Sequence, residues 1–140
     1  MDSDIYDKAR DLACSLVNAS GAEDTKEYWR LYHELEELCT SNENSGRNHP
    51  FQWETLADFT TDDVASIRIY EKAFTLAKKL ELEEYMSSVK LALAERYRGL
   101  NLSELAYSSA EEANEYAKSS SDLELRKEIS EFLLNEQQNI

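Results

Sequence analysis

The sequence predicts an all-α protein, and three observations favour this fold class. Apolar residues recur at helical spacing along the 140-residue chain, and no segment alternates apolar and polar residues as a strand would. Only three glycines and one proline are present, so few residues would interrupt long helices. Segments of the chain also resemble one another, which is typical of stacked helical hairpins. We therefore expect one domain, residues 1–140, with about six or seven helices.

The N-terminal part predicts two long helices, a loop and a short helix. The first helix should run from Ser3, as its N-cap, to Gly21, as its C-terminal stop. The second, at about 24–40, should begin at Asp24 or Thr25. Turn-forming residues at 41–50 predict a loop, and Pro50 is well placed to begin a short helix, so 41–60 is expected to be an insertion. The apolar stripes of these helices are Ile5, Ala9, Leu12, Ala13, Leu16 and Val17; Trp29, Tyr32, Leu35, Leu38 and Cys39; and Trp53, Leu56 and Phe59.

Four further helices are predicted in the C-terminal part. The first should be capped by Thr61 or Asp62 and extend to Leu80. The others cover about 83–99, 102–118 and 121–136. Their apolar positions include Val64, Ile67, Tyr70, Ala73, Phe74, Ala77 and Leu80; Tyr85, Val89, Ala92, Leu93 and Tyr97; Ala106, Ala110, Ala113 and Ala117; and Leu125, Ile129, Phe132 and Leu133.

Two internal similarities support a repeated architecture. The segment IYDKARDLA at 5–13 recurs as IYEKAFTLA at 69–77. A shift of forty residues places Ala73 and Ala77 on Ala113 and Ala117, and it also aligns the apolar positions of 85–93 with those of 125–133. A unit of this length with two helices is one stackable hairpin.

Residues 91–117, LALAERYRGLNLSELAYSSAEEANEYA, resemble the tetratricopeptide repeat. The matching positions are the large–small pair, the following aromatic residue and the small residues at the helix crossing: Leu93, Ala94, Tyr97, Ala106 and Ala113. Asn101 stands where the family prefers glycine, and asparagine accepts left-handed backbone angles. The family's closing proline is missing, and the unit is longer than the usual length of about 34 residues. The resemblance implies a tetratricopeptide-like antiparallel helix-hairpin stack.

The charge balance limits the classes of partner. Twenty-nine acidic and fifteen basic residues give a net charge of −14, which disfavours nucleic acid or an anionic membrane as partner. Acids outnumber bases by ten to four in residues 1–40 and by nine to three in 101–140. This excess has two interpretations: solvated helix faces that aid solubility, or a surface complementary to a basic protein.

Neither a membrane span nor a secretory leader is predicted. The longest uncharged run, residues 12–22, is too short to cross a bilayer, and the chain opens with Asp2 and Asp4 instead of basic residues. Cys14 and Cys39 lack metal-ligand spacing and are expected to be buried free thiols. We therefore expect a soluble cytoplasmic protein.

No catalytic constellation is visible in the sequence. Phosphate loops, nucleophile elbows and zinc-protease motifs are absent, and the only histidines are His33 and His49. Although His33 has acidic neighbours, one helix face with one histidine offers too few ligands for zinc. Neither an enzyme nor a cofactor nor a metal site is predicted.

A concave face is the expected binding surface, because the first helix of each pair lines it in such stacks. Taking 24–40, 83–99 and the last helix as these first helices, the predicted partner-binding residues are Trp29, His33, Glu36, Ser88, Leu91, Glu95, Arg98, Glu128, Glu131 and Asn135. Trp29 is either packed between helices or open as an anchor. The 41–60 insertion offers a second possibility: Trp53, Leu56 and Phe59 plug the stack, leaving His49, Phe51 and Gln52 free for contact.

Its size, its acidity and the insertion HPFQWETLADFT at 49–60 make the chain similar to small tetratricopeptide-type immunity proteins of bacterial toxin–antitoxin competition systems. That resemblance implies a protein-binding module that sequesters a partner, as an immunity protein neutralising a cognate basic bacterial toxin. The alternative is a tetratricopeptide-type adaptor or secretion chaperone that binds an extended peptide.

Overall fold

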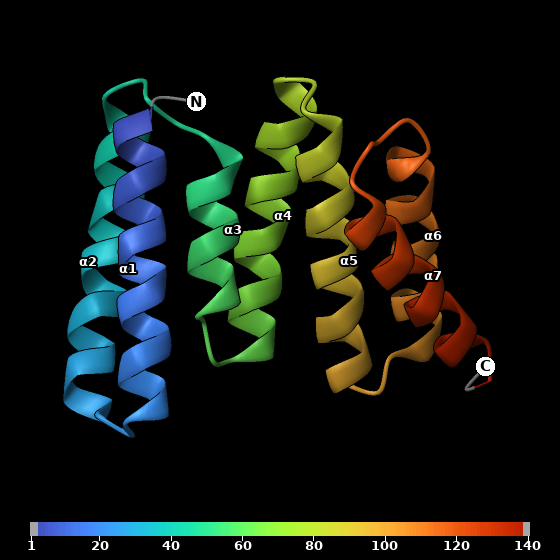
Figure 1. Ribbon diagram of the computed structural model, residues 1–140, viewed down its shortest axis with the longest axis horizontal. Helices are drawn as coiled ribbons and strands as arrows, with labels where there is room; N and C mark the ends of the chain where they lie inside the picture. The colour runs from blue at the N-terminus through green and yellow to red at the C-terminus, as the bar shows by residue number, and fades with distance from the viewer. Residues whose placement is uncertain (1–2, 139–140) are drawn as a thin grey trace.

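The computed structural model describes residues 3–138, which form seven α-helices and no strand, so the predicted all-α class is confirmed. The helices are α1 (Ser3–Gly21), α2 (Thr25–Asn44), α3 (Pro50–Asp58), α4 (Asp63–Lys79), α5 (Glu83–Gly99), α6 (Ser103–Ala117) and α7 (Leu123–Gln137). Figure 1 shows them as a row, with α1 and α2 at one end and α6 and an inclined α7 at the other. Over the described residues, no helix is both long and apolar enough to span a bilayer.

The helices pack as successive antiparallel neighbours in two layers. Helix α1 packs on α2, α3 on α4, α5 on α6, and α7 on α6. Helices α1, α3 and α5 also touch one another in that order, and α7 borders the same groove as these three. We call α1, α3, α5 and α7 the groove layer, and α2, α4 and α6 the outer layer.

Three of the turns between helices share one backbone geometry. Glu23, Glu81 and Asn101 adopt left-handed angles, with φ of 55°, 57° and 61°. The amide of the next residue in each turn donates to a carbonyl five residues earlier at 2.9 Å: Asp24 to Ala19, Leu82 to Ala77, and Leu102 to Tyr97. These bonds satisfy helix-end carbonyls and offset the left-handed strain. The predicted left-handed Asn101 is confirmed, whereas the first turn uses Glu23 and not Gly21.

Side-chain caps fix several helix starts at the expected residues. Asp24 accepts from the amide of Glu27 at 3.1 Å, and Asp62 accepts from that of Ala65 at 2.8 Å. Pro50 begins α3 as predicted, and His49 caps this helix by accepting from the amide of Phe51 at 3.0 Å.

The core consists of two clusters of buried side chains that meet at α5. One joins α1 to α5, and the other joins α5, α6 and α7. The four predicted alanines of α6 are buried, which allows the α5 and α6 backbones to approach closely. The predicted stripes were wrong at Val17, Trp29, Val64 and Leu80, which are exposed. Each lies at the edge of a stripe, where helical spacing alone does not decide burial.

The expected insertion at 41–60 is part of the regular stack. Helix α2 continues to Asn44, because the buried Asn42 donates from Nδ2 to Oε1 of Gln52 at 3.0 Å and stabilises the last turn. Helix α3 pairs with α4 as the first helix of a hairpin. Trp53 and Leu56 are buried in the core, as a plug would be, but Gln52 is also fully buried and is not free for contact.

The two internal similarities have different structural meanings. The forty-residue shift relates α4 to α6 and α5 to α7, and Ala73, Ala77, Ala113 and Ala117 are all buried. The shorter similarity relates α1 to α4, which belong to different layers. Its two tyrosines differ accordingly, since Tyr6 is exposed and Tyr70 is buried.

Candidate functional site

A groove of about 370 Å³ lies where the four helices of the groove layer meet, and we call it the central groove. Its acidic side chains come from α3, from α5 and from the residue before α7. Aromatic side chains from α1, α3 and α5 line the rest of its wall. The lining residues are Tyr6, Phe51, Glu54, Thr55, Asp58, Glu84, Tyr85, Ser88, Asp122 and Leu125.

Glu54 and Asp58 are the acids that α3 contributes. They are four residues apart, so both project from the face of α3 that lines the groove. Oγ of Ser88 donates to Glu54 at 2.5 Å, and the buried Tyr70 donates its hydroxyl hydrogen to Asp58. Neutral hydroxyl groups thus orient both carboxylates.

The surroundings of these acids disfavour their charged forms. Burial raises the pKa of Glu54 to about 7, although the bond from Ser88 acts in the opposite direction. Asp58 is exposed as a whole residue, but burial around its carboxyl group raises its pKa to about 6, against the effects of Tyr70 and Arg96. A carboxylate that is desolvated without a close cation has a raised pKa. A cation entering the groove would therefore be bound favourably.

Two further acids, Glu95 on α5 and Glu128 on α7, extend the acidic surface formed by Glu54 and Asp58, and we call these four residues the acidic band. Burial raises the pKa of Glu95, and the neighbouring Glu128 raises it further. Glu95 in turn contributes to the raised pKa of Asp58. Glu95 and Glu128 thus add negative charge on α5 and α7, although Arg98 and Arg96 act on Glu95 in the opposite direction.

Aromatic rings form the other part of the groove wall. The rings of Tyr6 and Phe51 stack with centroids 4.7 Å apart, and Tyr85 meets Phe51 edge-on at 6.4 Å. His49 packs edge-on against Tyr85 at 5.1 Å. The groove therefore combines flat apolar surfaces with carboxylates.

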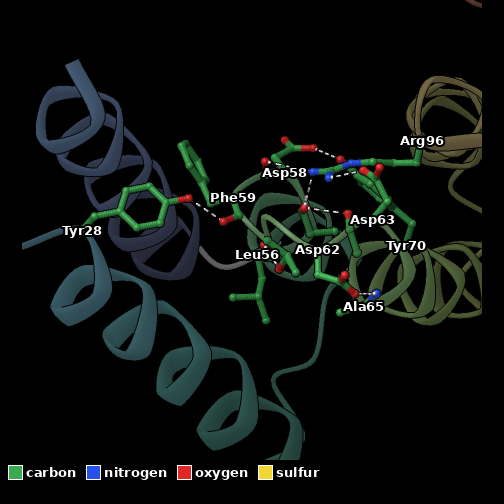
Figure 2. A network of polar contacts seen from close by, with 12 residues as sticks. Tyr28, Leu56, Asp58, Phe59, Asp62, Asp63, Ala65, Tyr70 and Arg96 are labelled. Atoms are coloured by element: carbon green, nitrogen blue, oxygen red, sulfur yellow. Dashed lines mark hydrogen bonds and ion pairs between the residues drawn. The ribbon is translucent and has the colours of Figure 1, made fainter. Parts of the chain in front are cut away.

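Arg96 holds α3, α4 and α5 together beside the groove, as Figure 2 shows. Its guanidinium group donates to the carbonyl of Ala57 at 3.1 Å and to Oδ1 of Asp63 at 3.0 Å. From α2, the hydroxyl of Tyr28 donates to the carbonyl of Phe59 at 2.5 Å. These bonds give partners to the backbone carbonyls of Ala57 and Phe59 at the C-terminal end of α3, and so they position Asp58.

The residues predicted on α5 and α7 lie in different surroundings. Ser88 lines the central groove, and Glu95 and Glu128 belong to the acidic band. Leu91 is only 4% exposed, so its predicted contact with a partner was wrong. It is buried in the core between α5, α6 and α7. Arg98 packs over the ring of Phe132.

Two more predicted residues of α7 are exposed. Glu131 lies 3.9 Å from Nζ of Lys127, one turn earlier on the same helix. Asn135 is exposed near the end of α7. Neither lines the central groove.

Trp29, His33 and Glu36 do not join the α5 residues in one groove, contrary to expectation. They share a face of α2 in the outer layer, with the Trp29 and His33 rings 6.4 Å apart and His33 Nδ1 3.5 Å from Glu36 Oε1. The prediction treated α2 as the first helix of a pair, but α1 and α3 hold that position. Trp29 is 41% exposed and borders a separate pocket near Thr61, so it is open and not packed between helices.

Sequence reasoning missed Tyr6, Glu54, Asp58, Glu84 and Tyr85 as groove residues. The spacing of Glu54 and Asp58, one turn apart on a helix whose other side is apolar, was the available indication. It was hidden because 41–60 was treated as an insertion and not as the first helix of a hairpin.

The two cysteines lie in different surroundings, and neither lines the central groove. Cys14 is exposed, against expectation, because it lies outside the buried stripe of α1. Burial raises the pKa of Cys39 to about 12, which disfavours the reactive thiolate. Within residues 3–138, no group of three or more His, Cys, Asp or Glu side chains is placed to hold a metal ion.

The central groove is thus suited to holding a cationic, partly planar group. Its carboxylates supply negative charge, and its rings supply apolar contact.

No protein-family model matches the chain, and no curated protein or solved structure matches it either.

Proposed function

We propose that this protein is a protein-binding module that sequesters a basic partner on its groove layer. One observation carries the proposal: Glu54 and Asp58, the two groove acids of α3, are desolvated, and their pKa values are raised. Within the described residues, neither Glu54 nor Asp58 forms an ion pair. Cationic side chains of a partner would relieve this unfavourable arrangement, and the charge of the groove layer would speed their encounter.

The finer fold proposal is a tetratricopeptide-like stack. It is supported by the forty-residue shift, by the buried alanines of α4 and α6, and by the repeated turn geometry at Glu23, Glu81 and Asn101. In stacks of that kind the first helices form the binding face. Here those helices are α1, α3, α5 and the terminal α7.

Within this class, we propose an immunity protein that neutralises a basic bacterial toxin in the cytoplasm. The proposal combines the sequence resemblance with the acidic groove layer. An adaptor or secretion chaperone that binds an extended basic peptide is the second candidate, because the central groove crosses all four helices of the groove layer. Neither function requires catalysis by this chain.

Affinity capture with a matched control tests the proposal. The test bait carries Glu54→Gln and Asp58→Asn. The control bait carries Glu111→Gln and Glu115→Gln, which remove two exposed charges, also one turn apart, from α6 of the outer layer. A partner identified by mass spectrometry from the source cell would then be purified and titrated against all three proteins. We expect one-to-one binding that weakens about tenfold or more only in the groove variant. Equal affinity of all three proteins would contradict the proposal.

Two further measurements separate the candidates. An immunity protein should abolish the activity of the purified partner at an equimolar ratio. An adaptor should leave that activity intact and release the partner to a competing peptide taken from the partner's own sequence.

A further inference from the structure

Within residues 3–138, a cation lies over an aromatic ring and near a carboxylate at three separate sites. Each uses one lysine or arginine, one ring and one glutamate, and the cation comes from a different helix than the ring and the glutamate do. Lys72 lies 4.0 Å from the ring centroid of Trp53 and pairs with Glu43. Lys90 lies 4.3 Å from that of Phe74 and pairs with Glu112. Arg98 lies 4.5 Å from that of Phe132 and pairs with Glu136. This recurring arrangement combines a ring quadrupole with a negative charge, and both attract the same cation.

The central groove has the rings and the carboxylates of this arrangement, but its described residues supply no cation. Tyr6, Phe51 and Tyr85 form the ring wall, and Glu54 and Asp58 lie on the adjoining face of α3. In the described part of the chain, no lysine or arginine lies over these rings or within ion-pair distance of the two acids. Arg96, whose charge lowers the pKa of Asp58, is held by Asp63 and by backbone carbonyls.

We infer that the central groove accepts an arginine side chain from the basic partner, an assignment that rests on the proposed function. The guanidinium group is planar, so it can stack on a ring while its donors face carboxylates. It is also less strongly hydrated than an ammonium group, which matters beside the desolvated Glu54 and Asp58. The groove volume of about 370 Å³ is within the range of pockets that hold small groups.

Lysine fits this site less well than arginine. Its ammonium group is compact, strongly hydrated and unable to stack as a plane. In the chain's own lysine sites, each ammonium lies over a single ring and close to one glutamate, at 2.7 Å for Lys72 with Glu43 and 2.8 Å for Lys90 with Glu112. The central groove instead offers two adjacent acids and a wall of three rings. These match the larger, planar guanidinium group of arginine, which has several hydrogen-bond donors.

The test uses small probes and does not require the partner. Nα-acetyl-arginine amide is titrated into ¹⁵N-labelled full-length protein, and amide chemical shifts are followed. Nα-acetyl-citrulline amide, which keeps the shape without the charge, and Nα-acetyl-lysine amide serve as comparisons. We expect saturable shifts centred on groove residues such as Tyr85 and Ser88, with arginine binding about fivefold or more tighter than either comparison.

Variants then locate the probe. Glu54→Gln and Tyr6→Leu should each weaken arginine binding about fivefold or more, whereas Glu111→Gln on α6 should leave it unchanged. Circular dichroism verifies that each variant is folded, and Glu84→Gln, an exposed groove acid, replaces any variant that is not. Equal responses to arginine and citrulline, or shifts spread evenly over the surface, would overturn the inference.

The outcomes for the inference and for the proposed function are distinguishable. If a basic partner binds in a groove-dependent way and the arginine probe does not, the inference fails and the proposed function stands. If the probe binds but affinity capture yields no groove-dependent partner, the proposed function fails.

Discussion

Replacing Glu54 by glutamine should stabilise the protein at alkaline pH while weakening its binding of a basic partner. In the folded protein burial raises the pKa of Glu54 from 4.5 to about 7. The folded state therefore binds this proton more tightly than the unfolded state does. The resulting stabilisation is complete below about pH 4.5 and is lost as the pH rises through about 7.

The magnitude follows from the same two pKa values. Since one pKa unit corresponds to about 1.4 kcal/mol, the charged Glu54 costs the folded state up to about 3 kcal/mol at pH 8. Partial exposure of the side chain reduces this cost. Glutamine carries no charge and can still accept the hydrogen bond from Ser88. We expect Glu54→Gln to raise the free energy of unfolding by about 1–2 kcal/mol at pH 8.

Urea unfolding of wild type and variant at pH 8 and pH 5 measures this difference. The gain should shrink toward zero at pH 5, where wild-type Glu54 is largely protonated in the folded state. Glu111→Gln, on the exposed face of α6, controls for the change in net charge. A Glu54→Gln protein that is less stable at pH 8, or whose gain is equal at both pH values, would refute the reasoning. Weaker binding by the more stable variant would show that the acid is retained for function.

Four further predictions follow from particular contacts. Ala113 is fully buried, and its carbonyl accepts from Oγ of Ser87 at 2.8 Å. Ala113→Leu should lower the free energy of unfolding by about 1–3 kcal/mol through overpacking, and an unchanged urea melt would contradict this packing. Arg96→Met should cost about 1–3 kcal/mol, because Asp63 and the carbonyl of Ala57 lose their charged donor; an unchanged urea midpoint would contradict that role. Trp29→Ala should lower the free energy of unfolding by less than the roughly 3–5 kcal/mol typical of a buried aromatic residue, because Trp29 is exposed. It should also leave binding of the arginine probe unchanged, and weaker probe binding would place Trp29 in the site. Association with the basic partner, followed by stopped flow, should slow about tenfold or more from low to high salt; a flat profile would mean that exposed charge does not steer the encounter.

Most helix positions could be predicted because their determinants are local. Asp24 and Asp62 cap the helices that follow them, and Pro50 begins α3, since a cap or a first-turn proline acts within a few residues. The end of α2 could not be predicted in the same way. Asn42 lies in a turn-forming stretch, and its helical conformation depends on a hydrogen bond to Gln52 of another helix.

The candidate site was predicted only in part, for a related reason. Ser88 and Glu95 were placed on the binding face because the tetratricopeptide resemblance makes α5 the first helix of a pair, and the forty-residue shift from α5 to α7 added Glu128. Leu91 was misplaced because a helix has more than one apolar side in a two-layer stack, and the side that is buried depends on α6 and α7. Trp29 was misplaced because α2 was assigned to the wrong layer.

By itself, the sequence determined the helical class, most helix starts, the buried alanines of α6 and the net negative charge. These properties depend on composition and on the helical period, which act along the chain. Only the tertiary structure decided which helices share a layer, and therefore that Glu54 and Asp58 meet Tyr6, Tyr85 and Ser88 in one groove. Layer membership depends on how successive hairpins pack against each other, and so does the desolvation that raises the pKa values of Glu54 and Asp58.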